Sequence, residues 1–125
     1  MVAIIHLPMV LVSRISYILF AFFGFCPICY LQFLSFGKEL CDKIRAAGYW
    51  ADYIDPCSGL PMISRDCNKV YSEVDGMEVL LNYKAYSAGF CKILTHPQWG
   101  SAVYPATIFV YAPRDAVVAL SLIHI

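Results

Sequence analysis

Cysteine gives this chain most of its potential chemistry, because a thiolate can attack an electrophile, bind a soft metal ion or close a disulfide. The 125 residues include six cysteines and three histidines. The cysteines are Cys26, Cys29, Cys41, Cys57, Cys67 and Cys91. An even number permits a disulfide framework, but such frameworks belong to secreted chains. The sequence has no clear secretory context and no matched spacings, so it predicts reduced, intracellular cysteines.

Cys26 and Cys29 form a C-x-x-C, a spacing that serves redox chemistry in some folds and zinc binding when a second pair is present. Here the pair lies inside an apolar run, and no second pair accompanies it. The sequence therefore favours two buried, unreactive thiols over a redox or zinc site.

Cys91 lies in a strand-like segment, followed by Lys92 and, five residues further on, by His96. A nucleophilic cysteine needs a nearby cation or a helix N-terminus to lower its pKa. Strand alternation points the side chain of Lys92 to the opposite face, and His96 lies beyond the strand. A structural cysteine is therefore favoured over a Cys/His catalytic pair.

No other constellation typical of an enzyme is present. Zinc-ligand spacing is absent from the remaining candidates, which are Cys57, Cys67, Cys91 and His96. Asp52 and Asp55 are close in sequence, but nothing beside them supports acid/base chemistry, and Asp55 is expected to cap a turn. The sequence also lacks a Gly-rich phosphate loop, a G-x-S-x-G and an H-E-x-x-H. From the residues alone we therefore expect no catalytic constellation and no metal site.

The first elements expected are a short helix and a strand. Apolar residues share one face of residues 38–47 at helical spacing, and Gly48 is placed to end that helix. Residues 49–54 are rich in strand-forming types. Residues 55–59 contain Asp, Pro, Ser and Gly, which predict a turn.

The second half of the chain predicts further strands. Residues 74–76 are typical of a turn, whereas periodicity does not decide between helix and strand over 77–83. Residues 89–95 and 102–111 are expected to pair as a hairpin, with Pro105 indicating an edge or a bulge. The sequence thus predicts an α+β domain in which a helix is followed by antiparallel strands.

Apolar residues make up 60% of the chain and charged residues 14%, against about 25% charged in ordinary soluble domains. The excess is concentrated in residues 2–36 and 116–125. Acidic and basic side chains balance at nine each, so no charge pattern favours nucleic acid or an anionic membrane surface.

The stretch between these two apolar regions has the composition of a soluble domain, which we place at residues 38–113. Residues 15–36, from Ile15 to Phe36, carry no charge and are long enough to span a bilayer. Residues 1–37 are thus either a membrane anchor or sequence that is not native to the gene. A signal peptide fits less well, because the apolar region is too long. Residues 114–125 are expected to be an apolar tail outside the domain, and not native.

One stretch of sequence is far more specific to a protein family than the rest of the chain. It begins with Gly48-Tyr49-Trp50-Ala51-Asp52 and continues through Ile54-Asp55-Pro56 and Ser58-Gly59-Leu60. Weaker matches follow in order at Gly89, Cys91-Lys92, His96, Trp99-Gly100 and Ile108-Phe109. With these motifs, residues 38–112 resemble the C-terminal part of the methylmalonic aciduria and homocystinuria type D (CblD) family.

The resemblance implies a modified nitroreductase-like α+β fold that binds no cofactor stably alone. It implies a cytoplasmic and mitochondrial adaptor in vitamin B12 trafficking, which meets a CblC-type cobalamin-processing partner. The pair would route cobalamin to methionine synthase and to methylmalonyl-CoA mutase. Two alternatives stay open from the residues: a small membrane-anchored protein that uses residues 15–36, and a remnant of a nitroreductase-like flavin enzyme.

The resemblance also implies one site residue. A cysteine thiolate of the family coordinates the cobalt of partner-bound cobalamin. The family tends to carry a Cys-Cys doublet after the glycine at this point, and the first cysteine of the doublet is the one assigned to cobalt. This sequence has Phe90-Cys91 instead. Cys91 is therefore the expected cobalt-facing thiolate, although alternation along the strand would point it away from the face of position 90.

Overall fold

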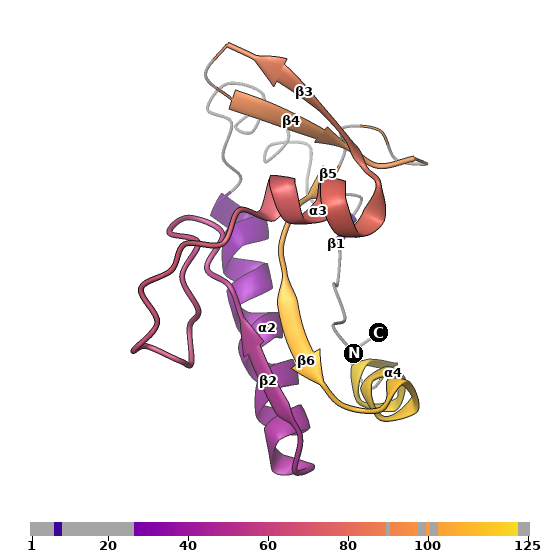
Figure 1. The fold of residues 1–125 in the computed structure, drawn as a ribbon. Coiled ribbons are helices and arrows are strands. Elements are labelled where there is room, and N and C mark those ends of the chain that lie inside the picture. The colour runs from indigo at the N-terminus through magenta and orange to yellow at the C-terminus, as the bar shows by residue number, and fades with distance from the viewer. Residues whose placement is uncertain (1–6, 9–26, 90, 98–99, 101–102, 123–125) are drawn as a thin grey trace.

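A computed structural model describes the chain at residues 7–8, 27–89, 91–97, 100 and 103–122. Helices and strands follow in the order β1 (Leu7–Pro8), α2 (Pro27–Ala46), β2 (Trp50–Tyr53), α3 (Glu73–Leu81), β3 (Lys84–Ala88), β4 (Cys91–Thr95), β5 (Val103–Tyr104), β6 (Ile108–Tyr111) and α4 (Arg114–Leu122). The described strands form three antiparallel pairs, β1 with β5, β2 with β6 and β3 with β4. This mixture of helices and antiparallel strands confirms the predicted α+β class (Figure 1).

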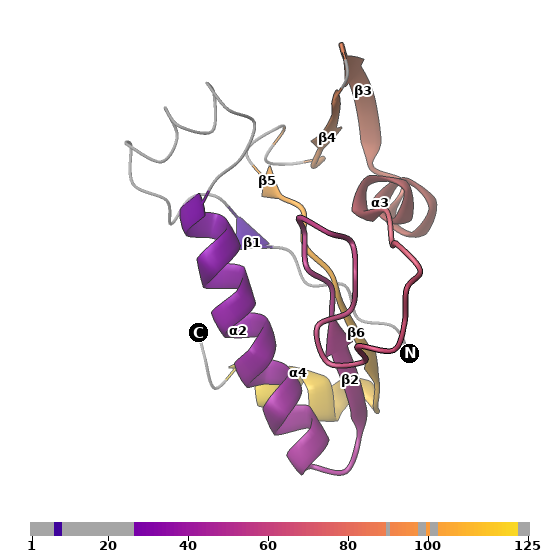
Figure 2. The same cartoon turned by 90° about the vertical axis from the view of Figure 1, so that its left-hand side faces the viewer.

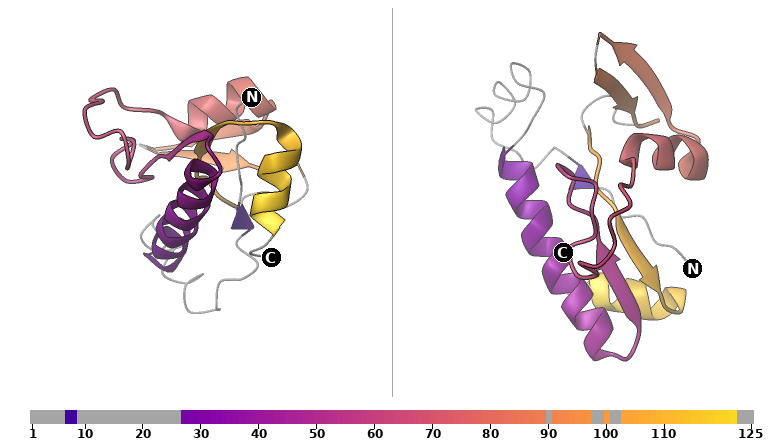
Figure 3. Two further views of the ribbon diagram at one scale, coloured as in Figure 1. Left: turned by 90° about the horizontal axis from the view of Figure 1, so that it is seen from below. Right: turned by 60° about the vertical axis from the view of Figure 1, so that its left-hand side comes forward.

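The main body consists of α2, the β2–β6 pair and α4. The helix α2 lies along one face of the strand pair, and α4 packs against α2 near the end that leads into β2 (Figures 2 and 3). The apolar side chains of α2 recur at helical spacing and are fully buried at Phe33, Leu40, Cys41 and Ile44. Gly37 allows close approach, because a Cβ there would lie 3.0 Å from a ring carbon of Tyr53 in β2.

The end of α2 sets the direction of β2. Gly48 has a φ of +90°, and the N–H groups of Gly48 and Tyr49 donate to the carbonyls of Arg45 and Ile44 at 3.0 and 3.2 Å. This is the Schellman arrangement of a helix C-terminus. The Arg45 side chain then donates from Nε to the Ala51 carbonyl at 2.7 Å, which ties the helix to the strand that follows.

The β2–β6 pair has two different faces. Its register, from Trp50 opposite Tyr111 to Tyr53 opposite Ile108, places alternate residues on opposite sides. The face toward α2 is buried and carries Ala51, Tyr53, Ile108 and Val110. The other face carries aromatic side chains, of which Trp50 is 48% and Tyr111 75% exposed.

The second unit consists of α3 and the β3–β4 hairpin. The Ser72 side chain caps α3 by accepting from the Asp75 N–H at 3.4 Å. Asn82 ends α3 in the left-handed conformation, with a φ of 54°. Met77 and Leu94 are buried here, outside the cluster of side chains that forms the main core. The unit therefore has only a small apolar centre of its own.

Several expectations about elements are settled by these pairings. The helix expected over 38–47 is the second half of α2, and the strand expected over 49–54 is β2. The expected hairpin between residues 89–95 and 102–111 is wrong, because β4 pairs with β3 and β6 pairs with β2. The turn expected at 74–76 is also wrong, because the Ser72 cap starts a helix there.

The apolar ends of the chain are described in part. Residues 27–36 are the first turns of α2, and residues 114–122 form α4, whose Val117 is buried in the main core. The expected composition boundary at residue 37 thus falls inside a helix. The remainder of the segment 15–36 lies outside the described residues. None of the helices described has the combination of length and hydrophobicity that crossing a membrane requires.

Candidate functional site

The predicted site residue, Cys91, is the first residue of β4 and lies at the tip of the β3–β4 hairpin. Ala88 and Cys91 are register partners, so only residues 89 and 90 connect the strands. Gly89 has a φ of +64°, which suits the first position of a two-residue hairpin turn. The tip of the hairpin points away from α3 (Figure 1). The backbone therefore carries position 91 at the free end of a projecting hairpin.

The hairpin has an inner face toward α3 and an open outer face. On the inner face Leu94 is 6% exposed, and Lys92 reaches α3 through an ion pair. On the outer face Ile93 is 43% exposed and its register partner Tyr86 is 56% exposed. Because strand residues alternate between faces, position 91 belongs to the series of Ile93. The side chain of Cys91 itself lies outside what the structure describes.

His96 lies past the opposite end of β4. Its ring packs edge-on against the ring of Tyr83, with centroids 5.1 Å apart and planes at 71°. Five residues of extended strand span about 16 Å, so the backbones of positions 91 and 96 are far beyond hydrogen-bond reach of each other. The strand therefore does not bring Cys91 and His96 together as a catalytic pair.

The remaining thiols are divided between core and loop. Cys29 and Cys41 are buried on α2, and burial raises the pKa of Cys41 to about 12, so it stays protonated. Cys29 is buried as predicted. Cys26, the other cysteine of the C-x-x-C, lies outside the described residues. Cys57 and Cys67 are exposed. Within the described part of the chain, no group of three or more His, Cys, Asp or Glu residues could hold a metal ion.

Asp52 is a structural centre of the loop that follows β2. Its carboxylate is 2% exposed and accepts three backbone N–H groups, from Tyr53 at 2.8 Å, Ile63 at 3.0 Å and Ser64 at 2.9 Å. Bonds of this kind to an ionised carboxylate are stronger than neutral ones. Asp52 therefore fixes residues 63 and 64 against β2, which uses its oxygens for structure and not for acid/base chemistry.

Asp55 organises the turn that begins the same loop. Its two oxygens accept from the Cys57 N–H at 3.1 Å and the Ser58 hydroxyl at 2.9 Å. The Gly59 N–H donates to the Asp55 carbonyl at 2.8 Å. The expected turn-capping role of Asp55 is thus confirmed.

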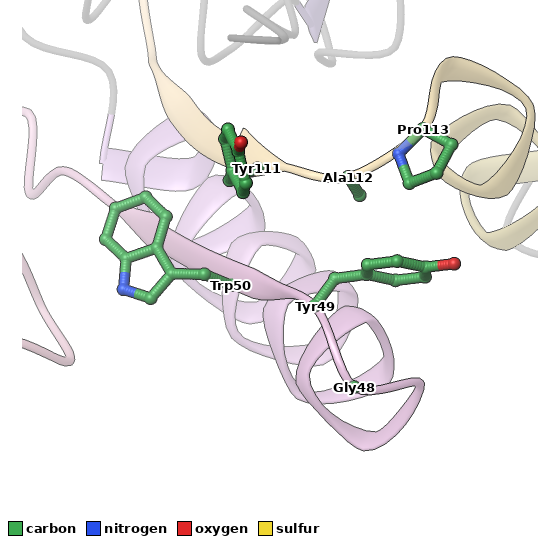
Figure 4. A pocket seen from close by; sticks show the side chains of 6 residues that line it. All are labelled: Gly48, Tyr49, Trp50, Tyr111, Ala112 and Pro113. Carbon is green, nitrogen blue, oxygen red and sulfur yellow. The ribbon is translucent and has the colours of Figure 1, made fainter.

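An open aromatic groove runs beside the start of β2 and the end of β6 (Figure 4). In that view Tyr111 stands over Trp50, while Tyr49 extends beneath Ala112 and Pro113. None of these lining side chains is charged, and no carboxyl, imidazole or thiol is among them. The groove therefore offers apolar contact but no groups for catalysis.

A sequence profile described as "Methylmalonic aciduria and homocystinuria type D protein" matches residues 30–122. The chain belongs to this family. The match extends beyond the expected limits of 38–112, since it takes in most of α2 and all of α4. The fold explains this, because both halves of α2 contribute to one core and α4 packs on it.

Curated CblD relatives agree with this assignment. The chain is 38% identical over 85 residues to the "Cobalamin trafficking protein CblD" of Mus musculus and to that of Homo sapiens, and 35% identical to that of Gallus gallus. Each alignment covers 68% of this chain and 29% of the relative. The chain thus spans less than a third of the length of these CblD proteins.

Two features of this CblD domain were not predicted from the sequence. The interruption of an otherwise apolar strand by Asp52 was a signal that the carboxylate has a fixed partner, but its partners are 11 and 12 residues away. The second is a group of buried polar atoms on Tyr71, Glu73 and Thr107. No local pattern links residues separated by more than 30 positions.

Proposed function

We propose that this chain is a non-enzymatic adaptor in cobalamin trafficking. Its membership of the CblD family carries the proposal, because the relatives are named as cobalamin trafficking proteins. Cobalamin is then cargo, held by a CblC-type partner and not stably by this chain alone. The pair would serve cytosolic methionine synthase and mitochondrial methylmalonyl-CoA mutase, and the α+β domain would be part of a nitroreductase-like fold without flavin.

Within this function, Cys91 is the thiolate that meets the cobalt of partner-bound cobalamin. A thiolate is a soft ligand that suits such an ion. In the coordination step the thiol releases its proton to solvent, and the sulfur donates a lone pair to cobalt in place of a water ligand. The oxidation state of cobalt does not change.

The hairpin geometry supports this choice despite the departure at Phe90. Gly89 opens the connection between the two strands, and position 91 is the first residue of β4. The change from Cys-Cys to Phe-Cys leaves a thiol at position 91, whose backbone lies at the tip of the hairpin. By strand alternation, position 91 shares the outer face with exposed Ile93 and Tyr86.

The test mixes the full chain with a CblC-type partner loaded with cobalamin, and follows co-elution and the visible cobalamin spectrum. Cys91→Ser is compared with Cys57→Ser and Cys67→Ser, which remove exposed thiols from a loop. We expect a spectral change that only Cys91→Ser abolishes. Co-elution without a spectral change would remove the thiol chemistry and keep the adaptor. A folded chain that shows neither would overturn the proposed function.

A further inference from the structure

Three buried polar atoms lie where the two units of the molecule meet. The atoms are the Tyr71 hydroxyl, Glu73 Oε1 and Thr107 Oγ1, each buried and without a hydrogen-bond partner among the residues that the structure describes. Tyr71 precedes α3, Glu73 is the first residue of α3, and Thr107 directly precedes β6. Buried polar atoms are nearly always paired in folded proteins. Three unpaired polar atoms at the junction of two units therefore call for an explanation.

Tyr71 shows how closely the units meet here. Its N–H donates to the Gly59 carbonyl at 2.8 Å, and its ring packs edge-on against Phe109 of β6, with centroids 5.1 Å apart. Gly76 of α3 leaves room for the Tyr71 hydroxyl, with which a Cβ at that position would collide. Tyr71 thus contacts the loop after β2 through its backbone, and the strand β6 and the helix α3 through its side chain.

Packing elsewhere between the units is sparse. The contacts between helices and strands fall into two main sets. In the first set, α2 contacts β2 and α4, and β2 contacts β6. In the second set, β3 contacts α3 and β4. Within the second set, the Lys92–Asp75 ion pair at 3.3 Å also links α3 to β4. A change at the junction would therefore move α3 and the hairpin together relative to the main body.

We propose that Glu73 is a pH-sensitive latch, whose neutral carboxyl holds α3 and the β3–β4 hairpin against the main body and whose ionisation loosens them. A neutral carboxyl can stay at this buried place, where its Oε1 has no partner among the described residues, without burying a charge. An ionised carboxyl at the same place is a buried charge. Movement of the start of α3 into water relieves that charge.

The groups that face Glu73 favour this behaviour. Burial raises the pKa of Glu73 to about 8; the Thr107 backbone N–H opposes the rise, and Asp55 from the loop after β2 adds to it. The pKa of Asp55 is itself low, because hydrogen bonds from Cys57 and Ser58 outweigh the effect of burial. Burial also raises the pKa of Tyr71, so its hydroxyl stays neutral. The Thr107 hydroxyl opposes that rise, although the two oxygens do not reach hydrogen-bond geometry.

The direction of the pH dependence follows from the two pKa values. In the loosened state the carboxyl is in water and titrates near its ordinary value of 4.5, whereas in the latched state it titrates near 8. Between these values the latched state holds a proton that the loosened state lacks, so loosening rises by up to about tenfold per pH unit. Above about pH 8 both states are ionised, and the dependence ends.

The test measures amide hydrogen exchange of the full chain from pH 6 to pH 10, corrected for the intrinsic exchange rate. We expect the protection of hairpin amides to fall about tenfold per pH unit up to pH 8 and to level off beyond. Amides of β2 and β6 should not follow. Glu73→Gln, which is permanently neutral, should keep the hairpin protected throughout, and the matched control Glu78→Gln on the same helix should behave as the wild type.

The titration of the Glu73 carboxyl, followed by carbon NMR in the unmodified chain, checks the proposal without any variant. A midpoint near 4.5 overturns it. So does a hairpin pH curve that survives in Glu73→Gln, or a parallel loss of protection in β2 and β6. Any consequence for Cys91 rests on the proposed function, but these measurements contain no cobalamin, so the two proposals fail separately.

Discussion

The main body and the hairpin unit differ in how much apolar side chain each buries. The body buries Phe33, Leu40, Ile44, Ile108 and Val110 to 2% exposure or less. The unit of α3, β3 and β4 buries Met77 and Leu94 and leaves Val79, Leu80 and Tyr86 exposed. Local stability follows buried apolar contact. The body is therefore a scaffold, and the unit that carries the proposed thiol is its weakly held attachment.

The largest effect should come from the core of the body. Phe33→Ala removes a side chain with no exposed surface, and comparable truncations cost about 3–5 kcal/mol. Urea unfolding of the full chain would measure it. Val79→Ala in α3 is the control, because that side chain is 78% exposed and its loss should change stability by less than about 0.5 kcal/mol. Similar losses in the two variants would contradict the division into scaffold and attachment.

Asp52→Asn should break the join between β2 and its loop. The carboxylate accepts three N–H groups, whereas an amide has one acceptor oxygen and places N–H₂ against a donor. We expect a loss of about 2 kcal/mol in unfolding free energy, with faster amide exchange at residues 63 and 64. Asp66→Asn, an exposed change in the same segment, is the control. Equal stability of both variants would show that the carboxylate is dispensable.

Gly76→Ala tests the contact between the two units. In an exposed helix this change stabilises by up to about 1 kcal/mol. Here the added methyl collides with the Tyr71 hydroxyl, so we expect a net loss of about 1–3 kcal/mol. Amide exchange should show the loss in α3 and the hairpin before it appears in β2 and β6. Adding Tyr71→Phe should recover part of it, and a stabilised Gly76→Ala variant would mean that the units are not locked through Tyr71.

The sequence predicts local structure better than pairing. Gly48 ends α2 and Asp55 folds its turn through neighbours within five residues, so both were predictable. The pairing of β2 with β6 joins residues about 60 positions apart. The alternation of apolar and polar residues in a strand does not identify the strand that pairs with it. Closeness in sequence wrongly favoured β4 as the partner of β6.

The candidate site divides in the same way. Cys91 could be identified because a family motif is a short, contiguous stretch of sequence. Its place at a hairpin tip depends on pairing with β3, a strand that was not predicted from the sequence. The junction of Tyr71, Glu73 and Thr107 exists only after folding brings three segments together. Long-range polar contacts of this kind leave no periodic trace in a single sequence.

The smallest effect should come from the ion pair between α3 and the hairpin. The side chains of Lys92 and Asp75 are 54% and 62% exposed, and exposed pairs contribute little. The Ser72 hydroxyl and then Lys92 lower the pKa of Asp75, so the contribution is present above its ordinary 3.8 and is lost as pH falls further. Lys92→Met should lower hairpin protection slightly at pH 7 and low salt, and this difference should vanish at high salt and as Asp75 takes up a proton below its ordinary pKa of 3.8. A larger loss than in Gly76→Ala would mean that charge, and not apolar packing, holds the hairpin to α3.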